Sequence, residues 1–172
     1  LELNTTGDNN SAYGHNALLN NTTADNNTAV GKAALEANTT GTYNTAVGAY
    51  SLDANTTASY NTAMGYYALS SETLGARNVA IGHETLASQN FTSATDSYNT
   101  AVGMAAGRLV TTGVNNTFIG GNAGTANTTG AQNDALGVNT LASNTTGSDN
   151  TAIGGWALQS NTTASNNVAI GR

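Results

Sequence analysis

The side chains that could carry out chemistry are few, and their spacing gathers no set of them. The chain has two histidines, His15 and His83, ten acidic residues, four basic residues and no cysteine. Acid–base catalysis needs ionisable groups within hydrogen-bonding reach, and a zinc site needs three or four ligands around one point. The carboxylates keep no common position in the repeat described below. We therefore expect no enzyme, no metal site and no cofactor.

The composition indicates a thin and regular structure. Asn, Thr, Ala and Gly make up 104 of the 172 residues, charged residues make up 8%, and proline is absent. Such a chain has few large side chains for a thick core and little charge to keep it disordered. A net charge of −6 argues against nucleic acid as a partner. Without an 18-residue apolar run, no membrane insertion is expected.

A short motif, Asn-x-Ala-aliphatic-Gly, recurs along the whole chain. The full unit reads N-T-A-V-G-x-x-A-L-x-x-N-T-T-G-x-x, and its glycines are 17 residues apart except for one step of 21. They stand at Gly14, Gly31, Gly48, Gly65, Gly82, Gly103, Gly120, Gly137, Gly154 and Gly171. The unit is too short for two packed helices and rich in residues that disfavour them. The pattern predicts an all-β protein, a parallel β-solenoid or β-roll of ten 17-residue coils stacked about 4.8 Å apart.

Residues 1–172 are thus expected to form a single repeat array with one insertion. The four extra residues fall in the link 89–98, and insertions in repeat arrays form loops on one face. Phe91 and Tyr98 in this link would either cover the neighbouring coils or touch a ligand.

Two columns of large aliphatic residues are predicted to face each other inside the coil. The first stands just before the glycine: Val30, Val47, Met64, Ile81, Val102, Ile119, Leu136, Ile153 and Ile170, with Tyr13 opening it. The second is Leu18, Leu35, Leu52, Leu69, Leu86, Leu141 and Leu158. Gly107 and Gly124 replace leucine in this second column, so two coils should be thin and refilled by Leu109 or Phe118.

A column of alanines precedes the first aliphatic column. Its members are Ala12, Ala29, Ala46, Ala63, Ala80, Ala101, Ala135, Ala152 and Ala169, with Phe118 as the one exception. Side chains alternate across a strand, so these alanines should point outward if Val30 points inward. Small residues on an outer face favour close packing by another chain. We therefore predict a subunit interface along Ala29, Ala46, Ala63, Ala80, Ala101, Ala135 and Ala152.

Two columns of asparagine are predicted to form hydrogen-bonded ladders, because an amide both donates and accepts. The first opens every motif: Asn10, Asn27, Asn44, Asn61, Asn78, Asn99, Asn116, Asn133, Asn150 and Asn167. The second, at the opposite turn, is incomplete: Asn4, Asn21, Asn38, Asn55, Asn127, Asn144 and Asn161. Several of these begin Asn-x-Thr sequons, so Asn38, Asn55, Asn127, Asn144 and Asn161 are possible glycosylation sites.

The two positions after each motif glycine vary most and should form a surface corner. They include four aromatic residues, Tyr50, Tyr66, Tyr67 and Trp156. Aromatic rings offer a flat apolar face that can stack on a sugar. These four are possible glycan contacts, or they fill a groove between subunits.

The repeat resembles those of known surface proteins. Asn78-Val79-Ala80-Ile81-Gly82 and Asn167-Val168-Ala169-Ile170-Gly171 resemble the head repeats of trimeric autotransporter adhesins. The longer unit is more similar to repeats of phage tail-fibre-type proteins and large bacterial surface proteins. The resemblance implies a left-handed parallel β-roll with three chains side by side, on a cell surface or virion. The adhesin head unit is shorter, and no coiled-coil stalk or membrane anchor is visible in this sequence.

These observations favour a structural or adhesive fibre segment. Such a shaft or head, extracellular or on a virion tail fibre, would present a recognition tip and contact host-surface glycans or proteins weakly. An alternative is a self-assembling extracellular filament with chains joined end to end. A rival of another class is an ice-binding solenoid, because Thr28, Thr45, Thr62, Thr100, Thr117 and Thr151 form a column. Val79, Asp134 and Val168 interrupt that column.

Overall fold

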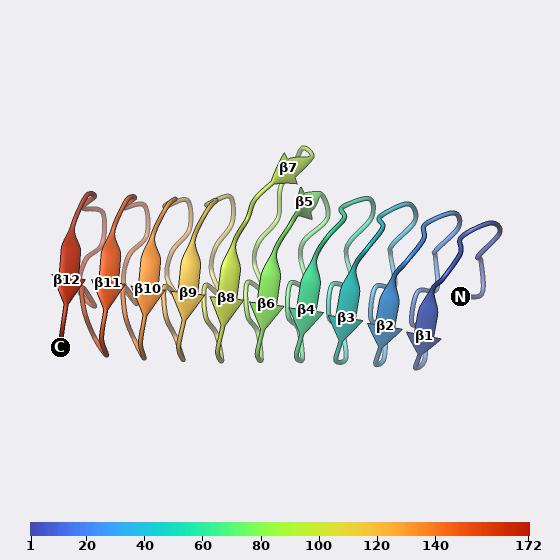
Figure 1. Cartoon of the computed structure of the whole chain (residues 1–172), viewed down its shortest axis with the longest axis horizontal. Helices are drawn as coiled ribbons and strands as arrows, with labels where there is room; N and C mark the ends of the chain where they lie inside the picture. The colour runs from blue at the N-terminus through green and yellow to red at the C-terminus, as the bar shows by residue number, and fades with distance from the viewer.

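Ten three-residue strands stack side by side along one axis in the computed structural model, which describes residues 1–172 (Figure 1). In order they are β1 Ser11–Tyr13, β2 Thr28–Val30, β3 Thr45–Val47, β4 Thr62–Met64, β6 Val79–Ile81, β8 Thr100–Val102, β9 Thr117–Ile119, β10 Asp134–Leu136, β11 Thr151–Ile153 and β12 Val168–Ile170. Every neighbouring pair is parallel, and equivalent motif residues pair with one another, as Ala29 does with Ala46. The predicted parallel β-solenoid with a 17-residue spacing is confirmed.

Two further short strands mark the insertion. β5, Gly75–Ala76, pairs with β7, Thr95–Asp96, in a separate two-stranded sheet. Their links project beyond the line of the other coils (Figure 1). The main sheet continues past them without a break, because β6 pairs with β8 in the motif register, Ala80 beside Ala101. No helix that is long and apolar enough to cross a bilayer is present.

The coil interior is built from the leucine column and the alanine column. Leu18, Leu35, Leu52, Leu69, Leu86 and Leu141 are fully buried, as the sequence predicts. The alanines of the strands are buried with them: Ala29, Ala46, Ala63, Ala80, Ala101, Ala135 and Ala152 expose at most 1% of their surface. A second set of small residues completes the core, including Ala34, Ala68, Ala106 and Ala123.

The predicted direction of the strand side chains is therefore wrong. Val30, Met64, Ile81, Ile119, Leu136 and Ile153 are 36–46% exposed, and Val47 and Val102 are half-buried. The physical reason is the width of the coil: a leucine already occupies the interior opposite most strands, and beside it only a methyl group fits. The larger aliphatic residue takes the outward position of the strand. The alanines accordingly face their own chain and cannot form the predicted subunit interface.

Phe118 shows how closely the interior volume is set. It is 1% exposed at a position where the other strands have alanine. A Cβ atom built on Gly107 would lie 2.9 Å from the Phe118 ring, and one on Gly124 would lie 2.5 Å from it. The ring thus fills the space that two leucines leave, as predicted for Phe118, whereas Leu109 is 40% exposed and does not refill the core.

The backbone conformation of the leucine column gives a second reason why glycine is found at positions 107 and 124. Leu35 and Leu52 have positive φ angles of 52° and 51°, and Gly107 and Gly124 have 59° and 58°. The left-handed region costs a residue with a Cβ atom about 1–2 kcal/mol. The buried leucine side chain must offset this cost, and glycine avoids it where Phe118 supplies the volume.

The asparagine that opens each motif forms an unbroken ladder. The Oδ1 atom of Asn27 accepts the backbone N–H of Asn44 at 2.9 Å, and its Nδ2 atom donates to the carbonyl of Gly41 at 2.8 Å. The N–H to Oδ1 bond repeats at every step from Asn10 to Asn167, including the step from Asn78 to Asn99 across the insertion. The predicted ladder is confirmed.

The second asparagine ladder is interrupted where the insertion lies. Asn55 donates its side-chain N–H to the Oδ1 atom of Asn38 at 2.8 Å, but the next residue in the column is Glu72. The Glu72 carboxylate accepts the N–H groups of Leu74 and Gly75 and the side-chain amide of Gln89. Because Glu72 supplies no amide to the column, the buried Oδ1 atom of Asn55 has no partner. The ladder resumes at Asn127.

Phe91 packs beside this interruption of the second ladder. It is 6% exposed, and a Cβ atom on Gly75 would lie 2.7 Å from its ring. Of the two roles open to it, Phe91 therefore covers the coils beside the insertion. Tyr98, by contrast, is 53% exposed.

The glycine that closes each motif is fixed by its backbone angle and by close contact with its neighbour. Gly48 has φ of 131°, and a Cβ atom there would lie 2.5 Å from the carbonyl oxygen of Gly65. We expect Gly48→Ala to lower the free energy of unfolding by about 2–3 kcal/mol, because a strained angle and a backbone clash coincide. Chemical denaturation followed by circular dichroism measures this change.

Gly121→Ala is the matched control. A Cβ atom on Gly121 meets nothing within 4 Å, and this glycine has no positive φ. Its substitution should change stability by less than about 0.5 kcal/mol. Equal losses of stability in the two variants would contradict the explanation that the backbone angle and the close contact require glycine at position 48.

The Phe118 ring occupies the space of two missing leucines, and this gives a second prediction. Phe118→Ala should cost about 3–4 kcal/mol, because it leaves a cavity beside two glycines. Adding Gly107→Leu and Gly124→Leu restores the usual repeat and should recover more than half of that loss. Gly124→Leu alone should be destabilising through overpacking. Additive effects in the triple variant would show that these side chains do not share one space.

Candidate functional surfaces

The histidine, aspartate and glutamate residues form no metal-binding cluster in this structure. No three histidine, aspartate or glutamate side chains lie close enough to hold a metal ion. The candidate sites are therefore surfaces, and each is a column of equivalent residues that the stacking of coils brings together.

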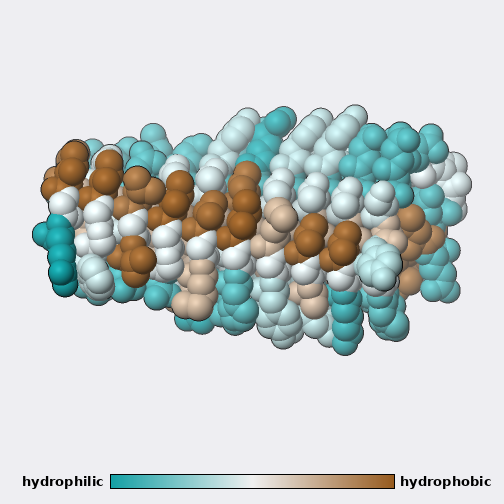
Figure 2. Space-filling view, turned by 60° about the horizontal axis from the view of Figure 1, so that its bottom comes forward, coloured by the Kyte–Doolittle hydropathy of each residue, from teal (hydrophilic) through white to brown (hydrophobic).

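The first surface is the aliphatic stripe, the outward residues Tyr13, Val30, Val47, Met64, Ile81, Val102, Ile119, Leu136, Ile153 and Ile170. Figure 2 shows a row of hydrophobic side chains running along one face of the rod. Beside it runs the other outward position of each strand, which is threonine or serine in seven of ten strands. Of the twenty outward strand residues only Asp134 is charged. The outer face of the sheet is thus flat, long and almost free of charge.

The second surface is the tyrosine corner, formed by Tyr50, Tyr66 and Tyr67. Tyr50 and Tyr67 stack with ring centroids 5.1 Å apart, and Tyr66 stands edge-on to Tyr67 at 4.3 Å. The Nζ atom of Lys32 lies 5.1 Å from the centre of the Tyr50 ring, and the Tyr50 hydroxyl raises the pKa of Lys32. The neighbouring Tyr66 hydroxyl raises the pKa of Tyr67. Three of the four predicted glycan contacts are therefore brought together.

Trp156 lies apart from the tyrosine corner. It is 44% exposed, and the Arg172 guanidinium lies 4.8 Å from its ring. Five motif steps separate Tyr67 from Trp156, so the four predicted glycan contacts do not form one site.

A shallow groove adjoins the tyrosine corner. We call it the Tyr67 groove; its volume is about 300 Å³, and it is lined by Tyr67, Ser70, Glu84, Ala87, Ser88, Arg108 and Leu109. Glu84 and Arg108 form a half-exposed ion pair across it, with 3.5 Å between Oε2 and Nη1. The sequence did not reveal this groove, because its residues come from three coils and only the insertion step aligns Arg108 with Ala87 and Ser70.

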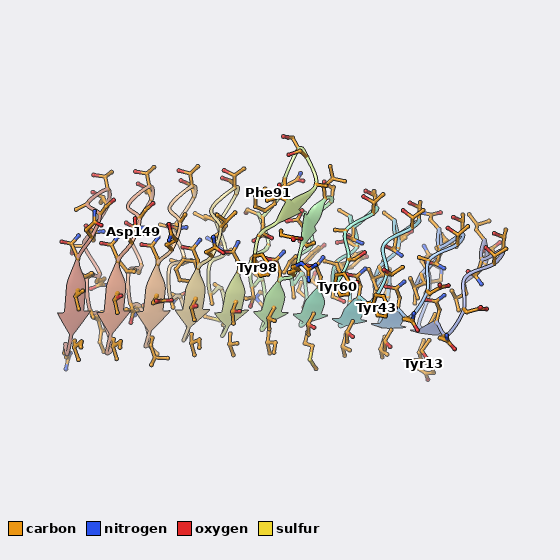
Figure 3. All side chains as sticks on the ribbon, turned by 45° about the horizontal axis from the view of Figure 1, so that its top comes forward. Tyr13, Tyr43, Tyr60, Phe91, Tyr98 and Asp149 are labelled. Carbon is orange, nitrogen blue, oxygen red and sulfur yellow. The ribbon has the colours of Figure 1, made fainter.

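The third surface is the tyrosine–arginine stack, which sequence reasoning missed. Tyr43 and Tyr60 stack at 5.2 Å, and the guanidinium of Arg77 lies 4.8 Å from Tyr60 and 5.8 Å from Tyr98. Figure 3 shows Tyr43, Tyr60 and Tyr98 in one row along the rod, with Asp149 farther along it. The sequence did contain a signal for this stack, because each of its tyrosines and Arg77 directly precedes the asparagine that opens a motif.

A notch of about 440 Å³ lies between this stack and the insertion. Tyr60, Leu74, Arg77, Thr95 and Asp96 are among its lining residues. Arg77 and Asp96 pair at 3.1 Å, and this contact raises the pKa of Arg77. Because Tyr43 and Arg77 cover the two faces of the Tyr60 ring, the notch offers polar groups and ring edges but no open aromatic face.

The predicted glycosylation column lies inside the protein. Asn38, Asn55, Asn127 and Asn144 are at most 1% exposed, and Asn161 is half-buried. The amide nitrogen of each donates to a carbonyl within its own turn. Burial leaves no room for a glycan on the first four of these residues, so the prediction was wrong for them. Glycosylation of Asn161 stays a prediction.

The comparisons give this chain no relative. No protein-family model, no curated protein and no solved structure matches it. The proposals below therefore rest on the residues and geometry of this chain and on the resemblance of its repeat.

One carboxylate on the surface is placed unfavourably by the stacking. Asp53 is half-buried, and its Oδ1 atom has no hydrogen-bond partner. Burial raises its pKa from 3.8 to about 6, with a further contribution from Glu36, which holds the equivalent position in the preceding coil. Between pH 4 and 6 the folded protein holds a proton that the unfolded chain has released, so this group makes stability fall as pH rises.

We expect Asp53→Asn to stabilise the protein by about 1 kcal/mol at pH 8, after allowance for solvent screening of a half-buried group. The gain should disappear at about pH 2, where the carboxyl is protonated in both states. Thermal unfolding at the two pH values measures the difference. Asp149→Asn is the control, since Asp149 is exposed and its column neighbours Gln132 and Asn166 are uncharged. A gain that persists at about pH 2 would contradict the assignment.

Proposed function

We propose that the chain is a structural segment of an extracellular or virion-surface fibre, a shaft or head in which rods lie side by side along the aliphatic stripe. The observation that carries this proposal is the stripe itself, an exposed aliphatic residue in nearly every strand. A continuous exposed apolar strip on a folded chain is typical of an interaction surface.

The character of the surrounding face supports another copy of the chain as the partner. The outward strand residues include one charge in twenty, so covering the face desolvates few charged groups. When parallel chains surround a common axis with their stripes facing it, each residue of a uniform stripe meets its own equivalent at every coil. The aliphatic stripe thus replaces the alanine column as the proposed subunit interface. The resemblance to trimeric adhesin heads supports three chains.

A rod with this construction suits a spacer. The first asparagine ladder and the backbone hydrogen bonds between coils run along the whole axis, and each coil contacts only its neighbours. Length then grows by repetition with no change in cross-section. This supports a role in holding a recognition element away from a cell or virion surface.

A second function, ice binding, is favoured by one observation. The threonine row and the aliphatic stripe lie side by side on one flat outer face, where regular hydroxyl and methyl groups could order water. Val79, Asp134 and Val168 break the threonine row. Ice binding needs this face open to solvent, whereas the fibre needs it covered.

The fibre proposal predicts that charges on the stripe separate the chains. Val47→Asp combined with Val102→Asp should convert a side-by-side assembly into single chains, because each carboxylate would be buried between rods. The circular dichroism spectrum should be unchanged, since both side chains point away from the coil interior. Sedimentation velocity measures the mass of each species.

Thr40→Asp combined with Thr129→Asp is the matched control, with the same charge placed on exposed turns away from the stripe. It should leave the assembly intact. A single chain for the unmodified protein, together with thermal hysteresis, would reject the fibre in favour of ice binding. Long unbranched filaments in electron micrographs would instead support end-to-end assembly.

A further inference from the structure

The Tyr67 groove combines an aromatic ring with polar groups in one small depression. Its volume of about 300 Å³ lies at the small end of ligand sites. Ala87 lies between Ser70 and Arg108 in one column, so a small side chain forms the floor. The depression therefore has a ring at one end and a charged pair at the other.

The ring is held in place before any ligand binds. Tyr67 stacks on Tyr50 with an angle of 11° between the rings, and Lys32 lies over Tyr50. Apart from Ser70, the other lining residues belong to the two following coils, so the groove lies on the side of Tyr67 away from Tyr50. A ring fixed by its neighbours loses little conformational freedom when a ligand stacks on it.

The ion pair retains hydrogen-bonding capacity. Its separation of 3.5 Å exceeds the 2.7–2.9 Å or so of a strong charge-assisted hydrogen bond. The side chains of Arg108 and Glu84 are 46% and 36% exposed, so both reach solvent. A carboxylate only accepts and a guanidinium only donates, so together they match adjacent hydroxyl groups, each of which does both. Ser70 and Ser88 add hydroxyls at the rim.

We propose that the Tyr67 groove binds one neutral hexopyranose unit of a surface glycan. The apolar face of the sugar ring stacks on Tyr67, and two neighbouring hydroxyls bind Glu84 and Arg108. A net charge of −6 and a carboxylate in the groove wall disfavour an acidic sugar. The proposal rests on the fibre function in one respect, since side-by-side chains would present several weak sites together and gain avidity.

Saturation-transfer NMR on the full chain tests the site, with the methyl glycosides of glucose, galactose and mannose as separate probes. At least one probe should receive saturation at its ring C–H protons, with millimolar affinity. Tyr67→Ala should weaken this binding at least fivefold, and Glu84→Gln should weaken it at least threefold. Tyr67→Phe keeps the ring and should change binding less than twofold.

Trp156→Ala is the control for an exposed aromatic outside the groove and should leave binding unchanged. Transfer to none of the three probes would overturn the proposal, as would equal losses in the Tyr67→Ala and Trp156→Ala variants. Binding restricted to a sialoside added as a fourth probe would also overturn it. Sedimentation of the same samples separates the two proposals, because failure of sugar binding in an assembled fibre rejects the site alone.

Discussion

In-register stacking of parallel coils is the constraint on which the rest of this structure depends. Hydrogen bonds between coils place each residue beside its own equivalent, 17 residues away along the chain, as Ala29 lies beside Ala46. A residue type is therefore suitable only if it packs well against itself. Asparagine meets this requirement because its amide donates on one side and accepts on the other, and glycine meets it because two backbones can then approach closely.

The same constraint explains which residues are scarce and where the structure is imperfect. Like charges in one column repel at the stacking distance, which accounts for a charged content of only 8%. Burial is the main cause of the raised pKa of Asp53, and Glu36 in the same column adds to it. Glu72 shows the penalty in another form, because a carboxylate in an amide ladder leaves the Asn55 oxygen unpaired. Aromatic residues tolerate the constraint, and the Tyr43–Tyr60 and Tyr50–Tyr67 pairs are stacked columns of this kind.

The sequence was sufficient for the fold but not for the direction of its side chains. Periodicity fixes the coil length, the register and the ladders, because each depends on spacing alone. Whether Ala29 or Val30 points inward depends on the width of the coil, and Leu35 fills the interior in a left-handed conformation. No pattern of hydrophobicity encodes that angle, and the usual expectation that larger residues lie inside gave the opposite answer. The pairing of Phe118 with Gly107 and Gly124 was the available clue, since a large residue beside two missing leucines identifies a shared interior.

The candidate surfaces could be predicted only in part from the sequence. Tyr50, Tyr66 and Tyr67 lie in positions that vary from coil to coil, which marked them as exposed. The row of Tyr43, Tyr60 and Tyr98 would have emerged from aligning the residue before each motif asparagine. The Tyr67 groove depends on three coils and on the alignment across the insertion, which only the three-dimensional structure shows.

The interruption of the second asparagine ladder also bears on the mechanics of the rod. On either side of the insertion two amide ladders run along the axis, whereas between Asn55 and Asn127 only one is continuous. The bending stiffness of a rod depends on bonds spread around its cross-section, so we expect the segment with a single ladder to be the most compliant. A fibre built from such units would flex at the insertion while the segments on both sides stay straight.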